Sequence, residues 1–394
     1  VAGKGTFTID GNGKVTFVPV PTYKDDVPPI TVKATVTVTN AKNESATITS
    51  TASYKPIIVP AEIDKAPATS TNLQGLVQTG TPTFTPKTVE VDGVQKTISV
   101  QANSYKLVKD GAESESLPAY KAGTSEQIGT YTINPQNGLV TFIPTDKTYT
   151  GAVDPVSVQA TGSNGVKVQT TYTPTITPVT PTKEPSATTD VQGKKQVSRI
   201  VLDTVETDAD KDKTVNFNKG SETGANGERV ELDASTLTLL NDAGAEVTSL
   251  TTTDGEYVLD KASKTITFTP NKTFVGPAKP VKVQIKDVNG TKVETTYTPT
   301  VNDVTMTSVD KESSAPQGKT QTGTPTFTVS TPEVRITGYK LLNPTGNTPV
   351  EGNEIEVPTE GTYRINPTTG EVTFIPKPGF TGKATGISVQ ATDE

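Results

Sequence analysis

Four stretches of the chain alternate apolar and polar residues on both sides of a short turn. Each begins with Gly-x-aromatic-x-aliphatic and ends with aliphatic-Thr-Phe-x-Pro. Alternation with a period of two residues is typical of a strand with one buried face, and two such runs joined by a turn indicate a β-hairpin. The predicted hairpins span residues 5–19, 129–144, 255–270 and 361–376.

The aromatic positions of these hairpins recur on the buried face. A sugar-stacking surface is the alternative for such a series, but their alternation with polar residues favours core packing. In the second and fourth copies the turn reads Asn-Pro-x-x-Gly, which places Pro where φ is preset and Gly where φ is positive. The predicted core aromatics are Phe7, Phe17, Tyr131, Phe142, Tyr257, Phe268, Tyr363 and Phe374.

Two further blocks recur in a constant order around the hairpins. Residues 156–175 match 281–300, and both centre on Asn-Gly, which predicts a second hairpin closed by a type I′ turn. Both blocks end in Thr-Thr-Tyr-Thr-Pro-Thr, and Tyr54 stands at the equivalent place in a looser first copy. We expect the Tyr to be buried, its hydroxyl bonded to a neighbouring backbone group. The opening block is Gln-Gly-x-x-Gln, at Gln74, Gln192 and Gln317.

This order predicts tandem all-β domains. We expect complete repeats at 60–180 and 181–303, the C-terminal half of a repeat at 1–59, and a repeat lacking its last strand at 304–394. The chain is then a window from a longer array, with an unpaired sheet edge at 386–394. Strand signals every 8–12 residues without helical periodicity indicate β-sandwiches, and residues 234–240 are assigned to a strand rather than a helical turn. Short Thr/Pro-rich linkers favour an elongated array.

Composition excludes most catalytic chemistry. The 394 residues contain no Cys and no His, which removes disulfides, thiol nucleophiles, the Ser-His-Asp triad and nearly every transition-metal site. Hydrophobic residues make up only 31%, and Thr, a β-branched strand former, is close to one residue in five. Carboxylate pairs such as Asp25 and Asp26 are present, but none recurs in a pattern that spans a cleft. We therefore expect no enzyme and no cofactor.

Charge and hydropathy argue against nucleic acid as a partner and against a membrane-spanning segment. The formal net charge is −7, which argues against nucleic acid because phosphate binding needs basic patches. No apolar run approaches 18 residues, so the sequence predicts no membrane span and no signal peptide.

The alternating acidic residues Asp208, Asp210 and Asp212 are the candidate metal ligands. Their spacing opens many calcium loops, but Lys213 stands where an EF-hand requires Gly and Lys219 where it requires Glu. A looser calcium site between domains is one reading, and a solvated acidic loop balanced by Lys211 and Lys213 is the other, which we favour.

Strand-borne lysines raise a second chemical question. Lys33, Lys167 and Lys282 are candidates for Lys–Asn isopeptide cross-links of the kind that some surface proteins carry. The alternative, which we favour, is that each faces water and protects a strand edge from pairing.

Taken together, the three blocks resemble the CshA-type fibril repeats of streptococcal surface adhesins, over essentially the whole chain. The resemblance implies a cell-wall-anchored, extracellular protein of a Gram-positive bacterium, with a role in virulence. In such proteins the repeats form a fibril that carries a distal binding region. The copy at 255–270 departs most, with Asp-Lys-Ala-Ser-Lys in place of the Asn-Pro-x-x-Gly turn and a longer acidic insert before it.

The resulting functional prediction is a structural stalk for adhesion to host or other cells. Its partners are the neighbouring repeats, and host extracellular-matrix or salivary glycoproteins through regions outside this window. The alternative is that the repeats themselves bind host glycoprotein or matrix, with or without calcium.

Overall fold

The regular secondary structure of the chain is almost entirely β-strand, which confirms the all-β prediction. The computed structural model describes residues 1–20, 23–91, 93–204 and 211–394. Within these ranges the helical structure is one 3-10 turn, η1 (Lys211–Lys213), and no helix there is long and apolar enough to cross a lipid bilayer. The chain divides into two compact units, which are described separately.

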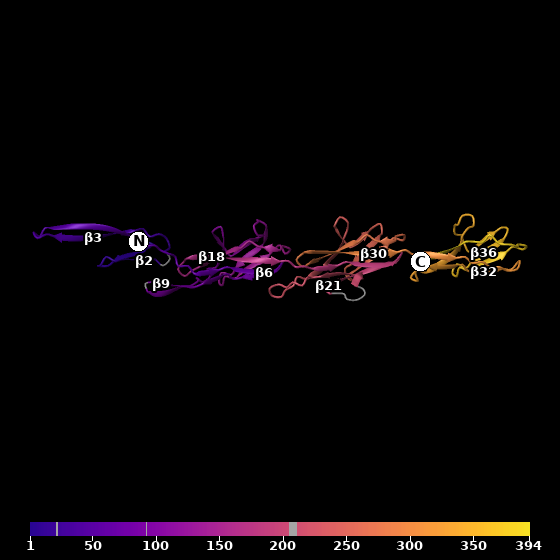
Figure 1. Cartoon of the computed structure of the whole chain (residues 1–394), viewed down its shortest axis with the longest axis horizontal. Helices are drawn as coiled ribbons and strands as arrows, with labels where there is room; N and C mark the ends of the chain where they lie inside the picture. The colour runs from indigo at the N-terminus through magenta and orange to yellow at the C-terminus, as the bar shows by residue number, and fades with distance from the viewer. Residues whose placement is uncertain (21–22, 92, 205–210) are drawn as a thin grey trace. The chain divides into compact units, whose positions relative to one another are not determined.

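Unit 1 comprises Val1–Pro181, Lys219–Leu232 and Lys286–Thr291. Its N-terminal part holds two hairpins, β1–β2 and β3–β4, and its larger part holds two sheets of orders β12-β11-β17-β18-β16 and β13-β14-β15-β7 (Figure 1). The strands are β1 (Gly5–Ile9), β2 (Val15–Pro19), β3 (Ile30–Thr39), β4 (Ser45–Tyr54), β5 (Asp64–Ala66), β6 (Ala68–Leu73), β7 (Gln78–Gly80), β8 (Thr83–Thr85), β9 (Lys87–Val91), β10 (Val94–Ile98), β11 (Lys106–Lys109), β12 (Ala112–Ser114), β13 (Ser116–Tyr120), β14 (Gln127–Ile133), β15 (Val140–Pro144), β16 (Gly151–Ala152), β17 (Val156–Thr161) and β18 (Lys167–Thr177).

The two large sheets of unit 1 form a sandwich around one apolar core. Tyr131 on β14 packs in a tilted contact on Phe142 of β15, with ring centroids 5.5 Å apart. It also makes an edge-to-face contact with Tyr172 on β18 of the opposite sheet, with the ring centroids 6.2 Å apart and the ring planes at 80°. All three rings are buried. The aromatic positions predicted from the alternation therefore join the two layers, as core residues should.

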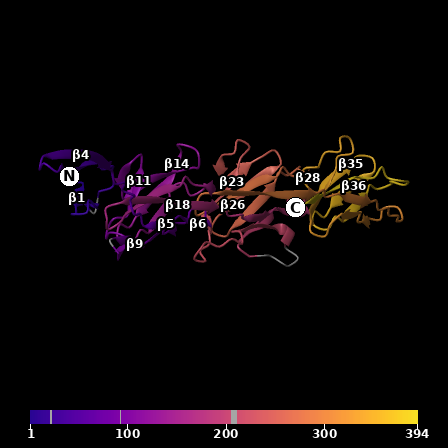
Figure 2. The same cartoon turned by 60° about the vertical axis from the view of Figure 1, so that its left-hand side comes forward.

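Unit 2 comprises Thr182–Asn218, Asp233–Ile285 and Lys292–Glu394. Its first sandwich has sheets of orders β19-β22-β21-β27-β26-β25 and β20-β30-β29-β23-β24, and a second part has the sheet β32-β37-β36-β35 and the pairs β34-β38 and β31-β33 (Figure 2). The strands are β19 (Thr182–Glu184), β20 (Ser186–Val191), β21 (Gln196–Leu202), β22 (Thr214–Asn218), β23 (Leu232–Leu240), β24 (Glu246–Val247), β25 (Ser249–Thr251), β26 (Gly255–Asp260), β27 (Thr265–Pro270), β28 (Gly276–Pro277), β29 (Val281–Asp287), β30 (Lys292–Asn302), β31 (Met306–Val309), β32 (Gln321–Gly323), β33 (Thr326–Val329), β34 (Ile336–Leu341), β35 (Glu354–Val357), β36 (Gly361–Ile365), β37 (Val372–Pro376) and β38 (Val389–Asp393).

The aromatic packing recurs in unit 2 with the same geometry. Tyr257 packs on Phe268 with ring centroids 4.7 Å apart. It meets Tyr297 of the facing sheet edge-to-face, with a centroid distance of 6.1 Å and an interplanar angle of 86°. In the later part of the unit, Tyr363 packs on Phe374 at 4.6 Å. The assignment of residues 234–240 to a strand is confirmed, since they lie in β23. The last strand, β38, pairs with β34, and its opposite edge has no strand partner among the described residues.

The four aromatic hairpins form as predicted, with their aromatic residues opposite each other in register. Phe7 pairs with Phe17, and Tyr131 pairs with Phe142. Gly138, the last residue of the Asn-Pro-x-x-Gly turn, has a φ of +73°, as the turn chemistry requires.

The type I′ turn predicted at Asn-Gly is wrong. A type I′ turn needs positive φ at both central residues, whereas only Gly165 and Gly290 have it. The loops are wider than two residues: Gly162 N–H donates to Val166 O at 2.8 Å, and Asp287 N–H to Thr291 O at 3.0 Å. In the second loop Asp287 Oδ1 accepts from the backbone of Asn289, so side-chain capping replaces the second positive φ.

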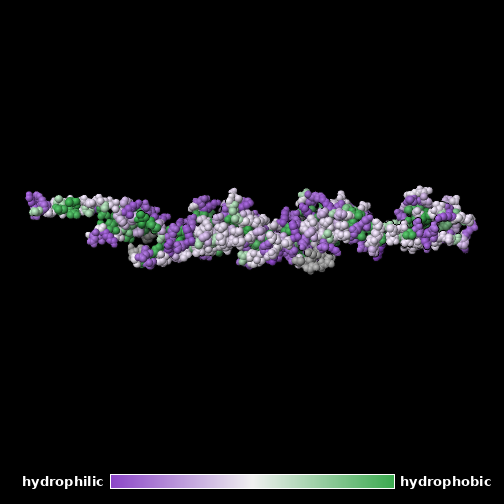
Figure 3. Space-filling view, in the orientation of Figure 1, coloured by the Kyte–Doolittle hydropathy of each residue, from purple (hydrophilic) through white to green (hydrophobic). Residues whose placement is uncertain are grey.

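The β3–β4 hairpin exposes several apolar side chains. The space-filling view has a green patch over β3–β4 (Figure 3), which corresponds to Val36, Val38 and Ile48. In the sandwiches the apolar side chains of equivalent strands lie inside.

Candidate mechanical clamp

In segment 60–180, the first long strand and the last one lie side by side and run in the same direction. Strand β6 pairs in parallel with β18 over six residue pairs, from Ala68 opposite Tyr172 to Leu73 opposite Thr177. Figures 1 and 2 both show the two strands adjacent. We call this strand pair the clamp of the segment.

Segment 181–303 contains an equivalent clamp in the same register. Strand β20 pairs in parallel with β30, from Ser186 opposite Tyr297 to Val191 opposite Asn302. In both segments the Tyr of the Thr-Thr-Tyr-Thr-Pro-Thr block stands at the first pair. The Thr-Thr-Tyr-Thr-Pro-Thr block therefore lies within the second clamp strand, and the Gln-Gly-x-x-Gln block begins directly after the first one.

The direction of the strands determines how the clamp responds to tension. The chain enters the clamp at the N-terminal end of β6 and leaves it at the C-terminal end of β18, which is the opposite end of the pair. Pulling on the two chain ends slides parallel strands along each other, so that all of their evenly spaced hydrogen bonds are strained together. An antiparallel hairpin pulled at its two ends opens one bond at a time instead.

A hydrogen-bonded side-chain cluster fastens the clamp of segment 60–180. Ser70 Oγ on β6 donates to Gln78 Oε1 at 2.7 Å and lies 2.6 Å from the hydroxyl of Tyr172 on β18. Because the single Ser proton goes to Gln78, the Tyr172 hydroxyl donates to Ser70. Gln78 Nε2 then donates back to Thr175 O on β18 at 3.0 Å. We call this trio the clasp.

The clasp recurs in segment 181–303. Thr188 Oγ1 donates to Gln196 Oε1 at 2.5 Å and lies 2.7 Å from the Tyr297 hydroxyl. Gln196 Nε2 donates to Thr300 O at 2.9 Å. All three side chains are buried, and each polar atom named here has a partner, so the cluster avoids the cost of an unsatisfied buried group.

Half of a third clasp is present near the C-terminal end of the chain. Ser313 Oγ donates to Gln321 Oε1 at 2.9 Å. The sequence signal for all three is a Ser or Thr eight residues before the second Gln of the Gln-Gly-x-x-Gln block. The Gln residues stood out in the sequence, but this spacing was missed. The prediction that the Tyr172 hydroxyl bonds to a backbone group is wrong, since its partner is the side chain of Ser70.

Burial keeps the clasp phenols neutral. Removal from water raises the pKa of Tyr172, and a hydrogen bond to Ser70 lowers it by a smaller amount. For Tyr297 the same opposed effects, burial first and the bond to Thr188 second, raise the pKa to about 12. The hydroxyls are therefore hydrogen-bond donors over the whole physiological range and are poorly suited to act as general bases near pH 7.

Of the three candidate metal ligands, the structure describes only Asp212. Asp208 and Asp210 lie outside the described residues, and Asp212 is exposed in η1. Among the residues that are described, no cluster of three or more acidic side chains is arranged to hold a metal ion. The calcium hypothesis stays a prediction.

Two of the three lysines considered for cross-linking pair with carboxylates at the surface. Lys167 Nζ lies 2.5 Å from Glu113 Oε1, and Lys282 Nζ lies 4.0 Å from Glu294 Oε2. Both lysine side chains are more than half exposed, as the water-facing alternative predicts.

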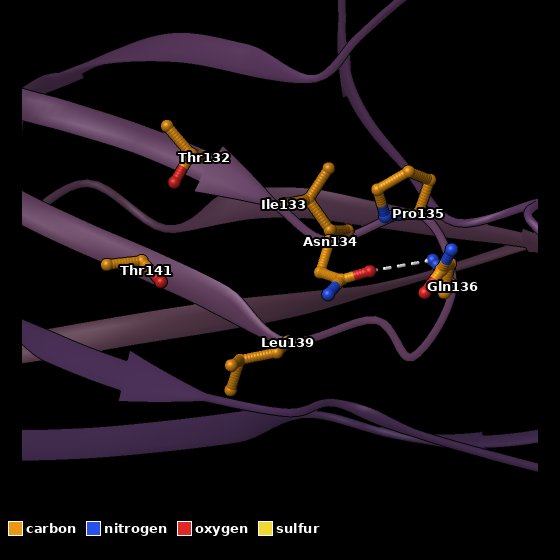
Figure 4. Close-up of a pocket in the computed structure, with 7 residues that line it drawn as sticks. All are labelled: Thr132, Ile133, Asn134, Pro135, Gln136, Leu139 and Thr141. Atoms are coloured by element: carbon orange, nitrogen blue, oxygen red, sulfur yellow. Dashed lines mark hydrogen bonds between the residues drawn. The ribbon is translucent and has the colours of Figure 1, made fainter.

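The hollow drawn in Figure 4 is formed by the turn of one aromatic hairpin. Asn134 Oδ1 accepts from the backbone of Gln136 at 2.9 Å, and Pro135 closes the turn between them. The lining residues carry no titratable side chain, so this hollow has no acid or base to offer a substrate. They are Thr132, Ile133, Asn134, Pro135, Gln136, Leu139 and Thr141.

Comparison with known proteins accounts for the recurrence of these elements. The family model of the surface adhesin CshA repetitive domain matches residues 60–176, 178–301 and 303–394. The chain belongs to this family. Three tandem CshA repeats therefore cover most of its length, and membership places them at the extracellular cell surface, in an adhesive or structural role.

Solved structures give weaker likenesses to the CshA repeats. A tetra-tandem repeat in the extending region of a large adhesion protein is 15% identical, over 98% of this chain and 86% of that chain, with a TM-score of 0.21. Protocadherin Gamma B2 extracellular cadherin domains 1–5 are 10% identical, over 98% and 70%, with a TM-score of 0.26. At TM-scores this low the likeness supports no statement about function. No curated protein matches the sequence.

Proposed function

We propose that these CshA repeats are the stalk of a cell-wall-anchored fibril. The stalk projects a distal binding region for adhesion to host or other cells, and it does so as a non-enzymatic spacer. Its structural domains are segments 60–180, 181–303 and 304–394. The observation that carries the proposal is the clamp: the first long strand and the last strand of each complete repeat are parallel neighbours, in identical register.

This arrangement suits a protein that is pulled from both ends. A fibril held by the cell at one end and by a ligand at the other transmits force through every repeat in series. Each complete repeat resists that force with one parallel strand pair, whose six residue pairs are strained at once, and with a clasp across it. Because the chain contains no Cys, resistance rests on packing and hydrogen bonds rather than on disulfides.

Replacement of the repeats in the parent surface protein tests the proposal. Residues 60–303 are exchanged for unrelated β-sandwich repeats of equal length, and bacterial adhesion to host glycoprotein is measured under flow. We expect adhesion to be retained with the replacement and lost when the same residues are deleted without a spacer. Loss of adhesion with both variants, together with saturable binding of the isolated chain to the glycoprotein, would instead make the repeats themselves the binding module.

A further inference from the structure

Unit 1 contains two loops whose sequence belongs to the following repeat. Residues 219–232 and 286–291, the second of which carries the Asn-Gly turn, pack with the end of segment 60–180. We propose that the end of segment 60–180 where β6 and β18 finish is a docking surface for these two loops of the next repeat. Contact there couples the folding of the two repeats, whether or not they carry tension. We call this contact the joint.

Gln74 is the centre of the joint. It follows the last clamp residue of β6, and its own N–H donates to Thr177 O at 2.9 Å. Its side-chain Nε2 donates to Thr291 Oγ1 at 2.7 Å, and its backbone carbonyl accepts from Asn289 Nδ2 at 2.9 Å. The side-chain Oε1 accepts from Val179 N at 3.1 Å. Gln74 is 2% exposed, so the loops cover a residue that lies at the end of the clamp.

The longer loop adds a second polar contact and an apolar one. Ala225 N–H donates to the buried Oδ1 of Asn72 at 3.0 Å. Val230, 3% exposed, packs with Leu73 and Val179 in a small apolar cluster separate from the sandwich core. A buried apolar cluster together with satisfied buried hydrogen bonds is the composition of a specific interface.

The Asn-Gly turn of segment 181–303 is equipped for this contact in a way that its counterpart is not. Asp287 Oδ1 accepts from the backbone of both Asn289 and Thr291, at 2.9 and 2.8 Å, and so fixes the two residues that meet Gln74. In segment 60–180 the positions of Asp287 and Thr291 are held by Gly162 and Val166. Val166 has no hydroxyl to accept a hydrogen bond from a Gln side chain.

Replacement of two glycines at equivalent places distinguishes the effect of losing the joint from the effect of straining the turn. Gly75 and Gly193 both follow the first Gln of the opening block, with φ of +76° and +81°. A Cβ on Gly75 would lie 2.1 Å from Asn289 Oδ1, whereas a Cβ on Gly193 would have no atom within 4 Å. Replacement by Ala therefore imposes a similar backbone strain at both positions, but it displaces Asn289 only at position 75.

Hydrogen exchange of the Ala225 amide in the full chain tests the joint, because its acceptor is Asn72 of the preceding repeat. We expect Ala225 to be protected in the unaltered chain. Gly75→Ala should speed its exchange by about tenfold, the equivalent of one hydrogen bond, while Gly193→Ala leaves it within about twofold. Asn289→Ala, which removes the donor to Gln74 and keeps the backbone caps on Asp287, should act like Gly75→Ala, and Asn164→Ala in the other turn should not.

Two results would overturn the joint. One is exchange of Ala225 in the unaltered chain at the rate of an unstructured peptide. The other is an equal effect of Gly75→Ala and Gly193→Ala while the sandwich amides of both segments stay protected. Neither result bears on the stalk proposal, which depends on the clamp within each repeat.

Discussion

The hydroxyl of Tyr172 lies 2.6 Å from Oγ of Ser70, a residue 102 positions earlier in the chain. This bond joins the last strand of a CshA repeat to its first long strand, and the next repeat reproduces it with Tyr297 and Thr188 at 2.7 Å. Because the bond crosses the two strands that tension would separate, it connects the recurrence of the sequence blocks to the proposed mechanical role.

Removal of the Tyr172 hydroxyl should weaken its own repeat. Tyr172→Phe keeps the ring against Tyr131 and deletes only the donor to Ser70, so we expect a loss of about 1 kcal/mol in the free energy of unfolding. Urea denaturation of the full chain, followed by exchange at amides of each segment, measures the loss. Tyr297→Phe is the matched variant and should weaken segment 181–303 instead. Additivity of Tyr172→Phe with Ser70→Ala would contradict the clasp, since coupled partners give non-additive losses.

Gly255, the first residue of the third aromatic hairpin, should resist replacement because of its close contacts rather than its φ. A Cβ on Gly255 would lie 2.3 Å from the backbone oxygen of Thr269 and 2.8 Å from the Phe268 ring. We expect Gly255→Ala to cost about 1–3 kcal/mol in thermal unfolding, because backbone and a core ring have to shift. Gly11→Ala is the control, since its Cβ would meet no atom within 4 Å. Equal melting temperatures for the two variants would rule out this close approach.

Alkaline pH should destabilise the sandwiches through their buried phenols. Burial raises the pKa of Tyr297 to about 12, above the ordinary value of 10.0. The unfolded chain therefore loses its protons first as pH rises, so this contribution to stability is fully present below pH 10 and is lost as pH rises toward 12. Chemical denaturation between pH 8 and 11.5 measures the decline. Tyr297→Phe should make the decline shallower, and an unchanged slope in this variant would contradict the assignment.

Calcium should leave the chain unaffected. We expect isothermal titration of calcium into the full chain to release no heat and to leave the melting temperature unchanged. Lys211 and Lys213 alternate with the acidic residues and balance their charge. Saturable heat that disappears in Asp208→Asn with Asp210→Asn would establish the calcium site in place of the solvated loop.

The local elements were predictable from sequence because their signals are local. Alternation of Tyr131 with polar neighbours specified a hairpin and a buried face, and Gly138 specified its turn. The Asn-Gly loops were predicted with the wrong turn, because Asp287 caps one of them with its side chain, a contribution that the dipeptide alone does not reveal.

The clamp was not predictable in the same way. Parallel pairing of β6 with β18 joins residues more than 100 positions apart, and the sequence pattern of neither strand indicates which strand it pairs with. The clasp had a readable signal, the eight-residue spacing of Ser70 and Gln78 in three copies. The joint had none, since Gln74 and Asn289 belong to different repeats and become neighbours only in the folded chain.

The most direct test of the stalk account is to pull the chain in two geometries by single-molecule force spectroscopy. With handles at the two ends of segment 60–180 in the full chain, the clamp is sheared. With handles placed on β17 and β18 next to the loop that joins them, the hairpin is peeled. The account predicts a markedly higher unfolding force in the first geometry, with a length gain of roughly 350–400 Å for the 68–177 sandwich, and a lower force there in Tyr172→Phe. Equal forces in the two geometries would contradict it.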